Sequence, residues 1–126
     1  LVLPHRDLYL ALPEAARMML AAVNDVLQPA HKHVGYRVAN EIAAYLAHAQ
    51  AEAGPDAWQT ALDLQLVQKV LPKLHGSRGT LERPLEGLAA LCIAPHGLSA
   101  RYPRALAQLE RMLGTLRAHG YASFVS

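Results

Sequence analysis

Proline and glycine residues divide the chain into five segments, and each segment carries apolar residues at the spacing of one helix face. Leucine and alanine supply 45 of the 126 residues, whereas valine, isoleucine and threonine supply 13, a balance that favours helices over strands. The sequence therefore predicts an all-α fold class, a compact bundle of about five helices with a short extended C-terminal tail. The predicted helices cover residues 13–27, 36–53, 56–71, 80–93 and 103–119.

The ends of these helices follow from the chemistry of single residues. Pro13 and Pro103 suit a first helical turn, and Gly120 suits the position after a last turn. Thr80 is the predicted N-cap of the fourth helix, and Pro84 is expected within the first turn of that helix. The tail, residues 121–126, is expected to pair as a short strand or to lie extended across the bundle.

Size and composition indicate one domain, residues 1–126, with a core that needs no cross-links. The single cysteine, Cys92, excludes an internal disulfide and fits a reducing compartment, so the expected location is the cytoplasm. No signal peptide or membrane-spanning segment is recognisable, and no membrane partner is expected. The chain starts without methionine, and we expect it to be part of a longer polypeptide.

Motifs for catalysis and for metal binding are missing from the sequence. There is no phosphate loop, no Gly-x-Ser-x-Gly, no His-Glu-x-x-His and no Cys-x-x-Cys. His31 and His33 lack a third metal ligand nearby and are interpreted as surface residues. No catalytic residue and no metal site is therefore predicted, and the acidic residues are expected to be solvated or salt-bridged: Glu41, Asp63, Glu82 and Glu86.

The junction before the second predicted helix is the most informative feature. Gly35 permits a sharp entry, and Arg37 then falls in the first helical turn. An arginine at that place can project toward a bound anion, which the helix terminus also favours. The other interpretation, a solvated surface arginine, is the more common one and stays open at this point.

Three segments together resemble the C-terminal lid of an AAA+ ATPase of the McrB-like branch, related to MoxR-type ATPases. They are Gly35–Arg37 opening a helix, Ala61–Asp63 leading into Gln68–Ser77, and a closing block. The closing block has these residues at comparable places: Ser99, Met112, Leu116, Gly120, Tyr121, Ser123 and Phe124. The resemblance runs from about Leu12 to Phe124.

This resemblance implies a lid that packs on an ATPase core and covers the nucleotide. Arg37 matches the sensor 2 arginine that reaches the terminal phosphate, so the implied nucleotide-binding residues are Gly35, Tyr36 and Arg37. The implied partners are the core of the same polypeptide, neighbouring subunits of a ring, and a nuclease in a restriction or anti-phage system. The parent would hydrolyse ATP or GTP with Mg²⁺, whereas these residues alone hold no cofactor and should not hydrolyse nucleotide.

Basic residues form two further groups. Lys73, His75 and Arg78 lie in or next to a predicted loop, and Arg101 with Arg104 precede or open the last helix. They are interpreted as solvated residues or as contacts to a neighbouring subunit or to DNA phosphates. The formal net charge of +2 predicts weak DNA binding at best. The alternative function is a stand-alone DNA-binding or adaptor module, in which helices 80–93 and 103–119 form a helix-turn-helix and the tail forms a wing.

Overall fold

The computed structural model describes residues 9–32, 34–94, 97 and 99–125. Helix α2 (Glu14–Leu27) follows a helical turn at residues 9–11 and leads into the short 3-10 helix η1 (Gln28–Ala30). Helix α3 (Tyr36–Ala53) and helix α4 (Ala57–Gln65) come next. Thus the helix predicted over 36–53 has the predicted bounds.

The second half contains two more long helices. After α4 the chain forms a π-helical turn, η2 (Leu66–Val70), and a 3-10 turn, η3 (Leu71–Lys73). Strand β1 (Gly76–Ser77) leads directly into α5 (Arg78–Leu91), and α6 (Pro103–His119) ends one residue before strand β2 (Tyr121–Ala122). The predicted all-α bundle with a short C-terminal strand is confirmed.

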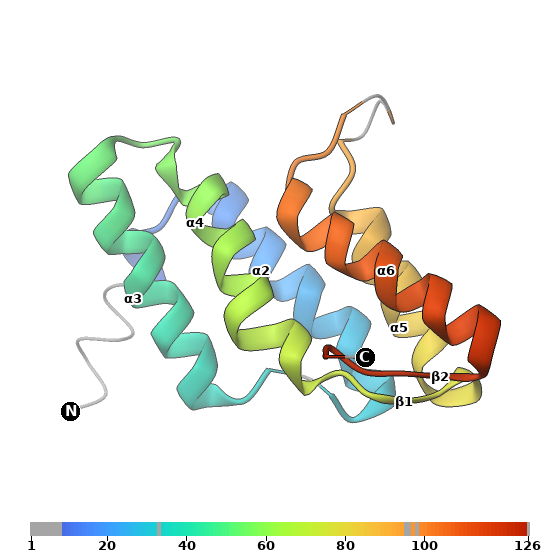
Figure 1. The fold of residues 1–126 in the computed structure, drawn as a ribbon. Helices are drawn as coiled ribbons and strands as arrows, with labels where there is room; N and C mark the ends of the chain where they lie inside the picture. Colours follow the sequence, from blue (N-terminus) through green and yellow to red (C-terminus); the bar gives the residue numbers. More distant parts are fainter. Residues whose placement is uncertain (1–8, 33, 95–96, 98, 126) are drawn as a thin grey trace.

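The helices pack as two antiparallel pairs, and α2 packs against one of them. Helix α3 lies against α4 at one side of the molecule, and α5 lies against α6 at the other side (Figure 1). Helix α2 packs against α5, and α4 packs against α6, which closes the bundle. The core is built from leucine, with smaller residues where helices approach closely; its fully buried members include Leu27, Ile42, Leu46, Leu62, Leu71, Leu81, Leu85, Leu109, Met112 and Leu116.

Two predicted helix boundaries, and the predicted position of one proline within its helix, are wrong. The helix expected over 56–71 is a regular α-helix only to Gln65, because Pro72 cannot donate to a carbonyl one turn earlier and the preceding turns rearrange. Thr80 is not the N-cap of α5, since this helix begins at Arg78 as soon as β1 ends. Pro84 therefore lies in the second turn of α5 rather than in the first.

The two short strands fix the end of the bundle at which α5 begins and α6 ends. Gly76 pairs with Ala122 and Ser77 with Tyr121 in antiparallel register. The Arg78 N–H donates to the Gly120 carbonyl over 3.1 Å, and Gly120 itself adopts a φ of 78°, which favours glycine. The predicted strand in the tail thus pairs with residues that were expected to form a loop.

Candidate functional site

The start of α3 carries the sequence-predicted nucleotide-binding residues. Gly35 has a φ of −69° and a ψ of 159°, and its carbonyl accepts the Ala39 N–H over 2.9 Å. This is extended backbone that any residue adopts, and a side chain at Gly35 would meet no atom within 4 Å. Gly35 thus permits the entry into α3, as other residues would, and Arg37 lies in the first helical turn, as predicted.

The side chain of Arg37 is exposed and has no hydrogen bond or ion pair with any residue that the structure describes. Its neighbour one turn later, Glu41, points to another element, because Lys69 Nζ lies 3.3 Å from Glu41 Oε1. The ordinary i, i+4 pairing that would hold Arg37 along its own helix is thus replaced. The guanidinium remains available to an external anion.

Other basic residues lie at the same end of the bundle as Arg37. The connection between α2 and α3, strand β1 and the start of α5 are all at this end (Figure 1). Lys73 and His75, which precede β1, and Arg78, which opens α5, are exposed. The first predicted basic group therefore shares an end of the bundle with the start of α3.

Arg101 and Arg104 lie at the opposite end, where α6 begins (Figure 1). A helix of the length of α6 spans about 25 Å. Arg104 Nη1 lies 3.7 Å from Asp63 Oδ2, and the Nε atom of Arg101 is buried. The two predicted basic groups therefore lie at opposite ends of the bundle (Figure 1).

Asp63 has a role that the sequence did not reveal. It is 1% exposed, and its carboxylate accepts the N–H of Arg104 over 3.1 Å and the N–H of Ala105 over 2.8 Å. These are the donors that a side-chain N-cap normally satisfies, and Tyr102 at the cap position of α6 makes no such bond. Asp63 of α4 therefore caps α6 from outside, in addition to the predicted salt bridge, which it forms with Arg104.

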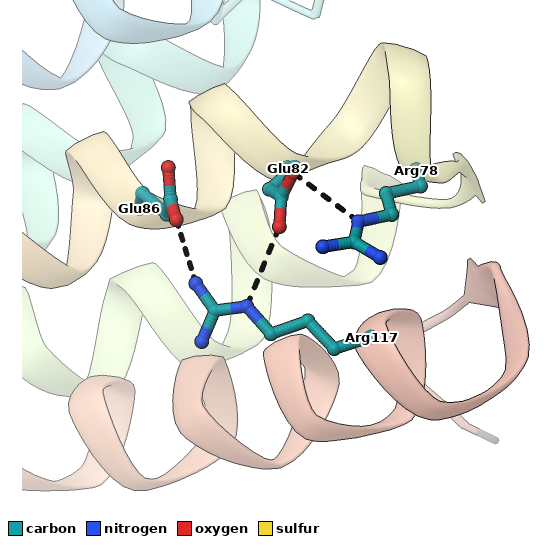
Figure 2. Close-up of polar contacts among 4 residues, drawn as sticks. All are labelled: Arg78, Glu82, Glu86 and Arg117. Carbon is teal, nitrogen blue, oxygen red and sulfur yellow. Dashed lines mark hydrogen bonds and ion pairs between the residues drawn. The ribbon is translucent and has the colours of Figure 1, made fainter.

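A charged network ties α5 to α6. Arg117 Nη2 lies 2.6 Å from Glu86 Oε2, and both Arg117 Nε and Arg78 Nε contact the Glu82 carboxylate (Figure 2). The hydrogen bond from Arg78, together with that from Arg117, lowers the pKa of Glu82. Arg78 is thus engaged within the chain, whereas Lys73 and His75 have no hydrogen bond or ion pair in the described part of it.

The groups that a metal site or a thiol nucleophile would need are not assembled. Among residues 9–32, 34–94, 97 and 99–125, no three His, Cys, Asp or Glu side chains gather to hold an ion. Burial raises the pKa of the Cys92 thiol to about 12, which keeps it neutral. Cys92 is a buried apolar residue of the core. His33 lies outside the described residues.

Among the helices in the same described ranges, none is long and apolar enough to cross a bilayer.

Nearly the whole chain matches the model of one protein family. Residues 4–121 match the model of a family described as a domain of unknown function, DUF8727. The chain belongs to this family. The matched DUF8727 segment contains Arg37, Asp63 and the Glu82 network, and it ends within β2. No significant match to the chain was found among curated proteins or among solved structures.

Proposed function

We propose that this DUF8727 chain is the lid of a ring-forming AAA+ NTPase and that Arg37 contacts the terminal phosphate of the bound nucleotide. The observation that carries the proposal is the placement of Arg37. Its guanidinium is exposed and unengaged in the described part of the chain, in the first turn of α3, where the unpaired backbone N–H groups also favour an anion. An arginine fork binds phosphate oxygens in pairs and keeps its charge at every physiological pH.

The arrangement of the other motif segments supports the proposal. The segment Gln68–Ser77 and the closing block, which resemble the lid in the sequence, meet as the β1–β2 pair. Both lie at the end of the bundle where α3 begins (Figure 1). Lys73 adds an exposed positive charge at the same end of the bundle, which would attract a nucleotide or an acidic surface of the ATPase core.

In this function the lid covers a nucleotide that the ATPase core holds with Mg²⁺. The core and the neighbouring subunits of the ring are the proposed partners, in the cytoplasm. A nuclease in a restriction or anti-phage system belongs to the same proposal, through the McrB-like resemblance. Rotation of the lid would then report the state of the nucleotide to the ring.

The geometry of α5 and α6 weighs against the helix-turn-helix alternative. A helix-turn-helix joins two helices set at a wide angle by a short turn. Here residues 92–102 separate two helices that run antiparallel, since Arg117 near the end of α6 pairs with Glu82 in the second turn of α5. Gln108 and Arg111, candidates for reading bases, both donate to the Phe124 carbonyl and hold the tail.

Nucleotide affinity tests the proposal. In the protein that carries both the ATPase core and this lid, Arg37→Ala should weaken binding of a triphosphate nucleotide by about tenfold and leave diphosphate binding nearly unchanged. The matched control is Arg83→Ala, which removes an exposed arginine of α5 that has no ion pair in the described structure. Equal losses for both nucleotides, or a reading frame that encodes no phosphate loop, would contradict the proposal.

A further inference from the structure

The segment that leads into α3 is held by a side chain of α2. Asn24 Oδ1 accepts the Val34 N–H over 2.8 Å, and Asn24 itself is half-buried. Val34 lies three residues before Arg37, so this bond fixes the chain just ahead of the first turn of α3. This hydrogen bond thus connects α2 to the segment that precedes Arg37.

Packing alone does not fix this region. A pocket of about 290 Å³, open to solvent, lies between α2, α3 and η2, and its lining includes Leu20, Asn24, Val34, Ala39, Ile42 and Val70. Side chains that face this pocket contact solvent on one side and not a packed neighbour, so close packing holds the helices in register less firmly there. Directional bonds therefore carry more of the positioning here than in the filled core.

The second polar contact at the start of α3 lies in solvent. It is the ion pair between Lys69 Nζ and Glu41 Oε1, whose side chains are 41% and 46% exposed. Exposed pairs contribute little and are screened by salt. In the described part of the chain, the Asn24–Val34 bond is the other polar tie between the start of α3 and the remaining bundle, and it is the better shielded one.

We propose that Asn24 is a positioning residue, which acts through the Val34 N–H to aim the first turn of α3 and with it the guanidinium of Arg37. The inference rests on the proposed function, because the aim of Arg37 matters only if the arginine meets a phosphate. A shift of about 1 Å at a group that contacts the reacting centre costs up to a hundredfold in rate. Asn24 touches neither nucleotide nor core in this account.

The first experiment measures the anchor in this chain directly. Amide hydrogen exchange is followed by NMR in the original chain, in Asn24→Ala and in Gln59→Ala, which removes an exposed amide from α4 as a control. Asn24→Ala should speed exchange at Val34 at least tenfold and leave the amides of α6 unchanged, whereas Gln59→Ala should change neither. Unchanged exchange at Val34 in Asn24→Ala would overturn the positioning role and leave the proposed function standing.

The second experiment is a double-mutant cycle on nucleotide hydrolysis by the protein that carries core and lid. Asn24→Ala should lower kcat about three- to tenfold with KM within about twofold, and Asn24→Asp, which keeps an acceptor oxygen, should restore it. In an Arg37→Ala background the same Asn24→Ala change should have no further effect. A further loss in that background, or no rescue by Asn24→Asp, means a merely structural role and overturns the inference. If Arg37→Ala alone leaves hydrolysis unchanged, the proposed function itself fails.

Discussion

Tyr102 and Cys92 are buried side by side at the base of the connection between α5 and α6. The Tyr102 side chain is 1% exposed, and its hydroxyl has no hydrogen-bond partner among the described residues. Burial raises the pKa of Tyr102 to about 12, in the same direction as that of Cys92. Both groups are acids whose neutral form is favoured in the folded protein, so the folded state binds their protons more tightly than the unfolded state does.

This difference predicts a loss of stability at alkaline pH. Below about pH 8 both groups are almost entirely neutral in both states, and their contribution to stability is complete. Between about pH 8 and pH 12 the unfolded chain releases the protons first, so the melting temperature should fall. Tyr102→Phe should reduce that fall, and at pH 7 it should leave the free energy of unfolding unchanged or raise it by about 1 kcal/mol, because the unpaired hydroxyl disappears. Thermal melts between pH 7 and pH 11 measure both effects. A Tyr102→Phe variant that is strongly destabilised at pH 7 would show that the hydroxyl has a partner.

At the scale of elements, the approach of α2 to α5 depends on Gly87. A Cβ atom added to Gly87 would lie 2.8 Å from Val26 Cγ1 and 3.4 Å from Val26 Cγ2. Valine is stiff about its first side-chain torsion and cannot turn both methyl groups away at low cost. Gly114 of α6 is also inside a helix, but a Cβ atom there would meet nothing within 4 Å.

Two glycine-to-alanine substitutions should therefore have opposite signs. Gly87→Ala should lower the free energy of unfolding by about 1–2 kcal/mol, because overpacking outweighs the better helix propensity of alanine. Gly114→Ala should raise it by up to about 1 kcal/mol. Urea denaturation of each variant is the measurement, and adding Val26→Ala to Gly87→Ala should restore part of the loss. Stabilisation by Gly87→Ala would mean that α2 and α5 are not in close contact.

The elements differ in how much of them the sequence could predict. Helix α3 lies between Gly35 and Gly54, and its bounds follow from local signals alone. Strand β1 could not be predicted, because its two residues become a strand only by pairing with Tyr121 and Ala122, far along the chain. The π-helical turn before Pro72 likewise reflects a compromise between a missing donor and continued packing of Leu66 and Val70 in the core.

The candidate site shows the same division between local and distant causes. The position of Arg37 in a first turn was predictable from Gly35 and the apolar spacing that follows. The cap by Asp63 was not, because the carboxylate serves N–H groups that lie far away in the sequence. The one local sequence signal for this cap is an acidic residue, Asp63, between Leu62 and Leu64. This pattern suggests a buried carboxylate that needs a partner, but it does not say which residue the partner is.

On the scale of the whole molecule, the two ends of the bundle have different roles. One end holds the start of α3 and the β1–β2 pair (Figure 1), and Arg37 and Lys73 are exposed in the segments that form it. At the other end Asp63 fixes the beginning of α6, which makes that end a structural junction. We therefore propose that the first end contacts the nucleotide, through Arg37.

The most direct test of this claim is the rate of nucleotide hydrolysis by the protein that carries both the ATPase core and this lid, compared with Arg37→Ala. We predict that Arg37→Ala lowers the rate of hydrolysis by about tenfold or more. A lost hydrogen bond to a charged group costs about 1.5–3 kcal/mol, and this one acts where negative charge develops. The same substitution should change the free energy of unfolding of this chain by less than about 0.5 kcal/mol, because the side chain is exposed. Normal hydrolysis by Arg37→Ala, or a chain that melts far earlier, would contradict the account and make Arg37 a structural or solvated residue.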